Sequence, residues 1–557
     1  MKKKLSLLVI AILMFSLIFT GCSNKIEPLE NVGGEVVAST NGTAYVEKGD
    51  YVYFINGIAN LDDNNEFGEV TKGALVRVNK YDLNSISNPT INDDGDVVKS
   101  TAKIEVVIPK INLSVQFKNA VYFFGDYVYF ATPSNKKNAA GTIKTSETEF
   151  YRFNLVKGEM DKKPIATMVD GTKEYMFTSK GDEVYLVYLV TETDENQESG
   201  KNFFKVVNAN TGKEVFTSPS YLSIALPEDS SNTIFYTINS YSKELDEDAN
   251  EKFDDIYSYS IGDEDAVIRL SGAGNYAKNR GDRIDDEGNE VVPMMLSIAG
   301  NEGFTASLIK NTGKFLIYSL TKLDSENPAV IYYGAEYNTE SGVIENLKEE
   351  NVVCFGYGND EFNPLVLTES AYYKSLNEIY YVDSTYGFCV FDYTKDTNKR
   401  VKPVGRDWKT YSLFKVDGNV MYFSDGNGVL YETDISVTEP KLYKLNGVAM
   451  ALGDTFYKPT IVKVNETIDG ATVEKKYLIG VYTAEYCYNY NYCVDITNAM
   501  EEPLEGETES NYVKGLNDLA SMDATKTNLI NATLVGIMLD TDLESYNNYL
   551  EATYVEE

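Results

Sequence analysis

Short runs of apolar and aromatic residues recur along the chain, and the clearest are entered through a turn-forming Gly-Asp pair at Gly49, Gly125 and Gly181. β-Branched and aromatic residues directly after such a pair favour a strand that follows a tight reversal. Eight copies of the pattern occupy residues 49–56, 125–132, 181–188, 232–237, 314–319, 377–382, 418–423 and 476–482. The pattern predicts eight equivalent strands.

A second apolar run follows in most of these units. It occupies residues 75–79, 150–154, 203–207, 255–259, 388–392 and 429–433. An all-strand repeat of roughly 60 residues is typical of a β-propeller. A single blade exposes both faces and its edges, so it becomes stable only when packed between neighbours in a closed ring. We therefore predict an all-β fold, a β-propeller over residues 35–500, with eight blades favoured and seven as the alternative.

The C-terminal part departs from this pattern. Residues 501–509 read as an acidic linker, and residues 533–538 could form one more strand. Thr541 and Glu544 have the spacing of a capping box that opens a final helix. We expect residues 501–557 to form a linker and a C-terminal extension, although the extra strand could instead close a blade.

The N-terminus has the layout of a bacterial lipoprotein signal. Three lysines precede an uncharged, mostly apolar run over residues 5–19, and Phe19-Thr20-Gly21 then leads to Cys22. An ordinary secretory signal or an uncleaved anchor are the alternatives. We predict a signal peptide over 1–21, acylation of Cys22 (palmitate being a typical chain), a tether over 22–34, and a protein held on the outside of the cell membrane.

The chain has a net charge of −35. An anionic membrane surface repels such a chain, so we expect lipid to attach the protein to the membrane. An acidic chain also does not bind nucleic acid through phosphates. We expect no nucleic-acid partner.

The chain contains no histidine, which excludes Ser-His-Asp and Cys-His nucleophile systems and histidine zinc sites. The spacings of Cys354, Cys389, Cys487 and Cys493 match no paired-thiolate metal motif. We expect no zinc, haem, iron-sulfur centre or other cofactor. In one unbroken strand Cys487 and Cys493 would lie about 20 Å apart, too far for a disulfide, whereas a turn at 489–491 would allow one.

Four tyrosines alternate with other residues just before residue 493. On a continuous strand, Tyr486, Tyr488, Tyr490 and Tyr492 would share one face. Such a face can pack against a neighbouring blade or stack on sugar rings. We expect packing, and keep the four as weak candidates for ligand binding.

The segments 41–57 and 67–77 resemble a family of uncharacterised propeller-like repeats in cell-surface lipoproteins of Gram-positive anaerobes, which carries a domain-of-unknown-function label. The resemblance is close over roughly residues 35–155. It implies a β-propeller of the broad YWTD and TolB kind and a surface location. This chain lacks a run of intact YWTD motifs and has the single tryptophan Trp408. The family brings no catalytic residues.

We expect a binding or scaffolding module for an envelope protein or glycan, and lean against an enzyme. The alternative is a carboxylate-based glycan-active enzyme, because that chemistry needs only two carboxyl groups at a defined separation. With 85 acidic residues, candidate pairs are unavoidable and select no site. A third interpretation, a folding factor for exported proteins, is not separable from the first by sequence.

Overall fold

The computed structural model describes part of the 557-residue chain. The described residues are 24–37, 41–57, 65–70, 72–87, 90–91, 97–98, 102–113, 121–136, 139–141, 147–169, 174–192, 200–228, 231–241, 252–263, 267–270, 283–284, 290–291, 304–322, 330–339, 342, 344–348, 372–383, 387–392, 401–403, 412–424, 430–437, 442–445, 459–483, 489–497 and 499–501.

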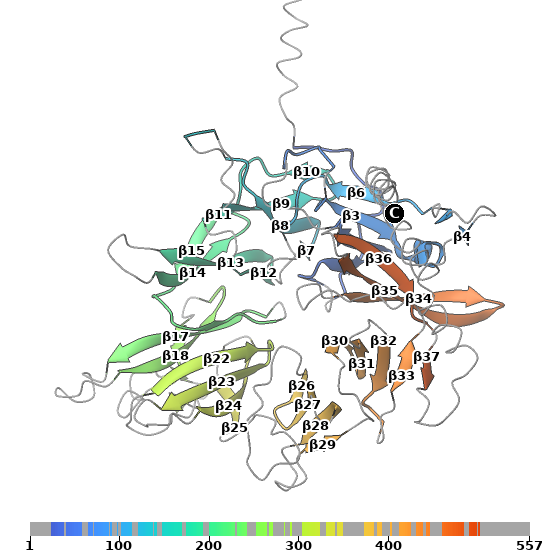
Figure 1. Ribbon diagram of the computed structural model, residues 1–557. Coiled ribbons are helices and arrows are strands. Elements are labelled where there is room, and N and C mark those ends of the chain that lie inside the picture. Colours follow the sequence, from blue (N-terminus) through green and yellow to red (C-terminus); the bar gives the residue numbers. More distant parts are fainter. Residues whose placement is uncertain are drawn as a thin grey trace, which may run out of the picture.

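Eight antiparallel sheets follow one another in chain order around a ring (Figure 1). The predicted all-β propeller with eight blades is therefore confirmed, and seven blades are excluded. Each of the eight repeats found in the sequence contributes the second strand of one blade. Residues of the apolar, β-branched type lie on both faces of these strands because each sheet is covered by two neighbouring blades.

Blades 1 to 4 come from the first half of the chain. Blade 1 contains β1 (Tyr45–Lys48), β2 (Tyr51–Ile55), β3 (Leu75–Asn79) and β6 (Glu105–Ile108). Blade 2 contains β7 (Tyr122–Phe124), β8 (Tyr127–Pro133), β9 (Thr148–Asn154), β10 (Glu159–Met160) and β11 (Ala166–Met168). Blade 3 contains β12 (Tyr175–Lys180), β13 (Glu183–Glu192), β14 (Lys201–Asn208) and β15 (Lys213–Thr217). Blade 4 contains β16 (Ile224–Ala225), β17 (Thr233–Tyr241), β18 (Lys252–Ser260) and β19 (Val267–Arg269).

Blades 5 to 8 complete the ring. Blade 5 contains β22 (Phe304–Asn311), β23 (Phe315–Lys322), β24 (Val330–Tyr337) and β25 (Ile344–Lys348). Blade 6 contains β26 (Tyr372–Ser375), β27 (Glu378–Asp383), β28 (Gly387–Asp392) and β29 (Val401–Pro403). Blade 7 contains β30 (Ser412–Asp417), β31 (Val420–Ser424), β32 (Leu430–Asp434), β33 (Tyr443–Leu445) and β37 (Ala499–Glu501). Blade 8 contains β34 (Thr460–Ile468), β35 (Ala471–Thr483) and β36 (Asn489–Asp495).

Small elements lie between the blade strands. They are the 3-10 helix η1 (Lys80–Asp82), the helix α2 (Leu83–Ser87), and the strand pairs β4 (Thr90–Ile91) with β5 (Val97–Val98) and β20 (Arg283–Ile284) with β21 (Glu290–Val291). Within the described ranges, no helix has the length and apolar character needed to span a bilayer. The strand expected at 533–538 and the helix expected at Thr541 lie outside those ranges.

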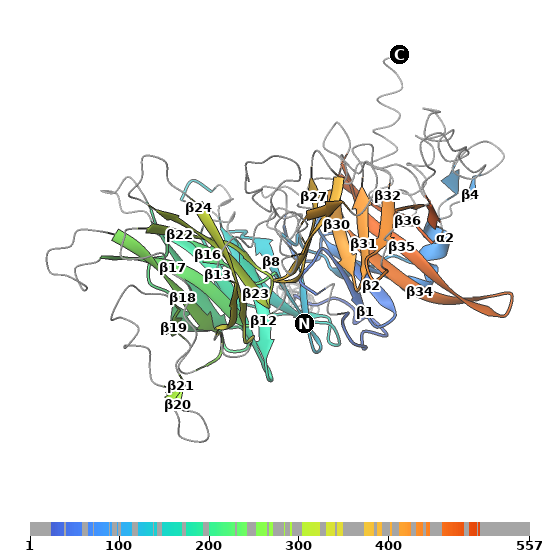
Figure 2. The ribbon, with the colours of Figure 1, turned by 90° about the horizontal axis from the view of Figure 1, so that it is seen from below.

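The ring has two unlike faces because neighbouring strands are antiparallel. The turns from first to second and from third to fourth strand lie on one side, which we call the turn face. The remaining connections lie on the other side, the loop face. Lys48 and Asp126, in the first turns of blades 1 and 2, interact electrostatically, and Lys180 pairs with Asp263 between blades 3 and 4, as expected for turns on a common face. Figure 2 shows the ring edge-on, with strands running between the two faces.

Ring closure depends on side chains. Within the described residues, blade 1 is built from N-terminal strands and blade 8 from C-terminal ones, and no described strand is exchanged between them. Instead, Val52 and Phe54 share a buried cluster with Val462 and Tyr477 of blade 8. After β36 the chain returns to blade 7, where β37 adds to β33.

The third strands of blades 5 and 8, β24 and β36, were absent from the predicted partner runs. β36 carries the end of the tyrosine run, whose alternating asparagines resemble a turn more than a strand. It pairs with β35 from Thr483 opposite Asn489 to Tyr477 opposite Asp495. Residues 489–491 therefore form part of a strand.

Candidate functional site

Polar side chains gather between blades 1 and 2 at the loop face. We call this set the loop-face cluster; it comprises Asn65, Lys110, Asn112, Ser134 and Glu149, all buried. Asn65 lies in the β2–β3 connection, and Lys110 and Asn112 follow β6. Ser134 and Glu149 lie at the adjacent ends of β8 and β9. All three connections open onto the same face, which is why these residues meet.

Asn65 joins the two blades. Its Nδ2 donates to Thr132 Oγ1 at 2.9 Å and to the Pro133 carbonyl at 2.6 Å, and its Oδ1 accepts from the Ile111 amide at 2.9 Å. Its carbonyl accepts from Lys110 Nζ at 2.8 Å. One asparagine therefore positions three connections of the loop face.

Lys110 is buried, with an exposed fraction of 6%. Its ammonium has three donors and makes one hydrogen bond to a described residue, the Asn65 carbonyl. The other donors have no partner in the described part of the chain. Burial lowers the pKa of Lys110 to about 8, partly offset by the charge of Glu149. A lysine with this pKa is a candidate functional group, although a structural role produces the same shift.

Asn112 supplies an acceptor beside it. Its Nδ2 donates to the Gly73 carbonyl at 3.1 Å and to the Lys110 carbonyl at 2.7 Å, which fixes the amide orientation. Its Oδ1 is buried and makes no hydrogen bond to any described residue. Buried polar atoms are usually hydrogen-bonded, so this oxygen is available to accept from a donor outside the described residues, such as a ligand.

Glu149 is already satisfied. It accepts from Ser134 Oγ at 3.2 Å and Tyr151 OH at 3.0 Å, and it pairs with Lys136 Nζ at 3.0 Å. The other buried carboxylate in the described part, Asp255, lies in blade 4. The two therefore form no glycosidase-like pair. The groups left available in the loop-face cluster are the donors of Lys110 and the acceptor of Asn112, which together suit a hydroxyl or a primary amide.

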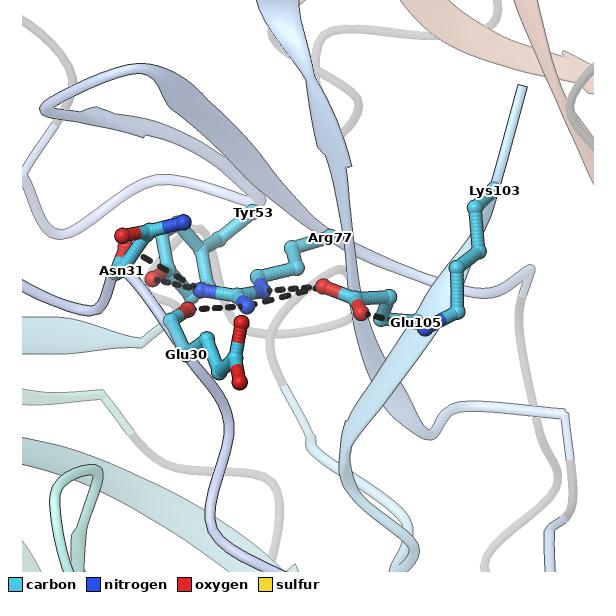
Figure 3. Close-up of polar contacts among 6 residues, drawn as sticks. All are labelled: Glu30, Asn31, Tyr53, Arg77, Lys103 and Glu105. Atoms are coloured by element: carbon cyan, nitrogen blue, oxygen red, sulfur yellow. Dashed lines mark hydrogen bonds and ion pairs between the residues drawn. The ribbon is translucent and has the colours of Figure 1, made fainter.

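A second polar cluster surrounds Arg77 on the blade 1 side of the same interface (Figure 3). Its guanidinium is 1% exposed and pairs with Glu105 at 2.8 Å. It also donates to the Glu30 carbonyl at 2.6 Å and the Asn31 carbonyl at 3.4 Å, and lies 3.9 Å from the Tyr51 ring centroid. Partial burial favours the neutral form of Glu105, but hydrogen bonds from Lys103 and Arg77 to its carboxylate outweigh this and lower its pKa. This cluster binds the chain's own N-terminal segment.

The predicted site residues lie only partly within the described chain. Cys22, Tyr486, Tyr488 and Cys487 lie outside it, as does the side chain of Tyr490. Tyr492 is 1% exposed and packs over Gly480, where an added Cβ would come within 2.5 Å of the tyrosine hydroxyl oxygen. Tyr492 therefore packs against β35 of its own blade, whereas the packing expected for Tyr486, Tyr488 and Tyr490 stays a prediction.

Cys493 is a buried thiol that faces blade 1 and forms no disulfide in the described part. Burial raises its pKa, which keeps it protonated. The free thiol of Cys493 therefore gives no evidence for the alternative, a disulfide with Cys487. No group of three or more Cys, Asp or Glu side chains with the proximity of a metal site occurs among the described residues.

The loop-face cluster was missed from sequence. Asn65, Lys110 and Glu149 are separated by 45 and 39 positions and share no motif. The one available signal was an apolar run, Val106 to Leu113, interrupted by Lys110 and Asn112, which are unusual types for a buried segment.

Comparison with known proteins adds only distant structural similarity. No protein-family model matches the chain. No curated protein matches it either. Similar solved structures include the β-propeller domain of the Trilobed protease from Pyrococcus furiosus, with 10% identity and a TM-score of 0.27 over 84% of this chain and 96% of that one. BamB from Moraxella catarrhalis has 8% identity and a TM-score of 0.27, over 83% and 95%. Sqt1 from Chaetomium thermophilum has 10% identity and a TM-score of 0.30, over 68% and 81%. A β-propeller scaffold serves binding or scaffolding in general, and its particular function depends on its site.

Proposed function

We propose that this protein is a lipid-anchored, extracytoplasmic propeller that binds or scaffolds a partner in the cell envelope, either a protein or a glycan. The anchor is Cys22, after removal of residues 1–21, and it holds the protein on the outer side of the cell membrane. The family of surface lipoproteins that the N-terminal repeats resemble is consistent with this location.

The observation that supports a binding role is the loop-face cluster. It leaves donors on buried Lys110 and an acceptor on buried Asn112 at one inter-blade site. Glycan hydroxyls and side-chain amides of proteins each present both a donor and an acceptor. Because the acidic chain repels phosphates and other polyanions, neutral polar ligands are favoured.

Photo-crosslinking in cells that produce the protein tests this proposal. A benzoylphenylalanine at Lys136, a half-exposed residue of the loop face, is compared with one at Lys157 in the third turn of blade 2. We expect an adduct from position 136 and none from 157, and protease or glycosidase digestion of the adduct then reveals the class of partner. Equal adducts from the two positions, or none from 136, would contradict a loop-face binding role.

A matched pair of variants tests the cluster itself. Lys110→Met in the position-136 background should remove the adduct, because it removes the buried donors. Lys103→Met changes an 81% exposed lysine at the opposite end of the strands and should leave the adduct unchanged. If Lys110→Met retained the adduct, the partner would not bind through the loop-face cluster.

A further inference from the structure

Residues 24–37, which we call the strap, are bound to the rim and turn face of blades 1 and 2. At the first end, the Met160 amide donates to the Asn24 carbonyl at 2.9 Å and the Ile26 amide donates to the Gly158 carbonyl at 2.9 Å. Lys25 adds an ion pair with Glu159 at 3.0 Å. The strap thus begins as an additional strand segment along β10.

The other end of the strap binds the first turn of blade 1. The Gly49 amide donates to the Glu35 carbonyl and the Val37 amide to the Glu47 carbonyl, each at 3.0 Å. Lys48 Nζ donates to the Gly34 carbonyl at 2.6 Å. A hydrogen bond from a charged donor, such as the Lys48 ammonium, to a main-chain carbonyl is stronger than a hydrogen bond between two neutral groups.

The middle of the strap covers the core shared by the two blades. Its apolar side chains pack against the blade 1–2 core; they are Ile26, Leu29, Val32 and Val36. Arg77 donates hydrogen bonds to the intervening carbonyls of Glu30 and Asn31. The blade turns also accommodate the strap, because a Cβ at Gly158 would lie 2.6 Å from the Ile26 carbonyl and one at Gly49 would lie 2.6 Å from the Gly33 carbonyl.

We propose that the strap is a rigid mount that holds the rim of blade 2 against the bilayer, with the opposite blade 6 farthest from it. This inference rests on the proposed acylation of Cys22. Two residues of chain span at most ~7 Å, so an acyl group on Cys22 lies within that reach of Asn24 and hence of β10. A flexible linker would allow the ring to rotate freely above the membrane, whereas a bound strap beginning at residue 24 leaves no such linker.

The orientation is measured on the mature chain coupled through Cys22 to a maleimide lipid in phosphatidylcholine vesicles. Cys354→Ser and Cys487→Ser leave only the buried Cys389 and Cys493 as other thiols. A fluorophore is attached through an azido residue at Lys157 of blade 2 or at Lys374 of blade 6, both exposed. Quenching by a lipid with a nitroxide on its headgroup reports contact with the bilayer surface.

We expect strong quenching at position 157 and none at 374. A Gly-Ser insert between Ser23 and Asn24 should abolish the difference, since it adds a flexible linker before the strap. The same insert after Val37 should preserve it, because the strap stays bound by its own contacts. Equal quenching at both positions in the parent, or no effect of the first insert, would overturn the proposal. Because the lipid is attached chemically, failure of acylation in cells would leave this result unaffected.

Discussion

Tyr45 and Asn491 join the two ends of the propeller. The Tyr45 hydroxyl in β1 donates to Asn491 Oδ1 in β36 at 3.0 Å, and Asn491 Nδ2 donates to the Ile55 carbonyl at 2.8 Å. No described strand is shared between blades 1 and 8, so among the described residues these bonds and the apolar contacts around them join the two blades. Thr460 Oγ1 adds a third polar contact, to the Tyr45 carbonyl at 3.3 Å.

Loss of this link should destabilise the whole ring. Tyr45→Phe leaves Asn491 Oδ1 without its buried donor, so we expect the free energy of unfolding to fall by about 1–3 kcal/mol in denaturant titration. Tyr81→Phe, at an exposed position, is the matched control and should have no measurable effect. A parent-like stability for Tyr45→Phe would show that closure does not depend on this bond.

Arg77 should control release of the strap. Arg77→Ala removes the donors to Glu30 and Asn31, so we expect trypsin to cleave after Lys25 about tenfold faster or more, in keeping with the loss of charged hydrogen bonds. Lys103→Ala is the control, because Lys103 is the exposed partner of Glu105 and contacts no strap residue. This variant also loses one tryptic site. If both variants were cleaved at the parent's rate, Arg77 would not hold the strap.

Tyr492 should stabilise the fold through its ring and not through its hydroxyl. The ring is buried over Gly480, while the hydroxyl has no hydrogen-bond partner among the described residues. We expect Tyr492→Ala to lower the free energy of unfolding by about 3–5 kcal/mol. Tyr492→Phe should be neutral or slightly stabilising, because it removes a buried unpaired polar group. A large loss in Tyr492→Phe would reveal a partner for the hydroxyl.

Lys110 should make stability depend on pH in a defined direction. Its pKa is about 8 in the folded chain and 10.5 ordinarily. Between these values the unfolded chain binds the proton that the folded chain has lost, so the free energy of unfolding rises with pH. Relative to Lys110→Met, which lacks this group, the parent should gain stability between about pH 8 and 10.5. A constant difference between the two proteins across that range would contradict a buried charged lysine.

The repeats were readable from sequence because each second strand is an apolar, β-branched and aromatic run, and the clearest of them follow a tight Gly-Asp turn. β36 was harder to predict, since Asn489 and Asn491 favour turns, and its strand conformation depends on pairing with β35 and on the contacts of Asn491 with blade 1. The loop-face cluster was not predictable at all. Lys110 and Asn65 meet only because the ring brings the ends of successive strands to one face.

The mass of the N-terminal peptide, measured on protein extracted with detergent from the membranes of cells that produce it, shows whether Cys22 carries the lipid anchor. We expect a chain that begins at Cys22 and carries a diacylglyceryl group on the thiol, and a Cys22→Ala variant that is released or left unprocessed. A chain that begins at Met1 or at another residue, or a Cys22→Ala variant that stays membrane-bound with the parent's mature mass, would contradict it.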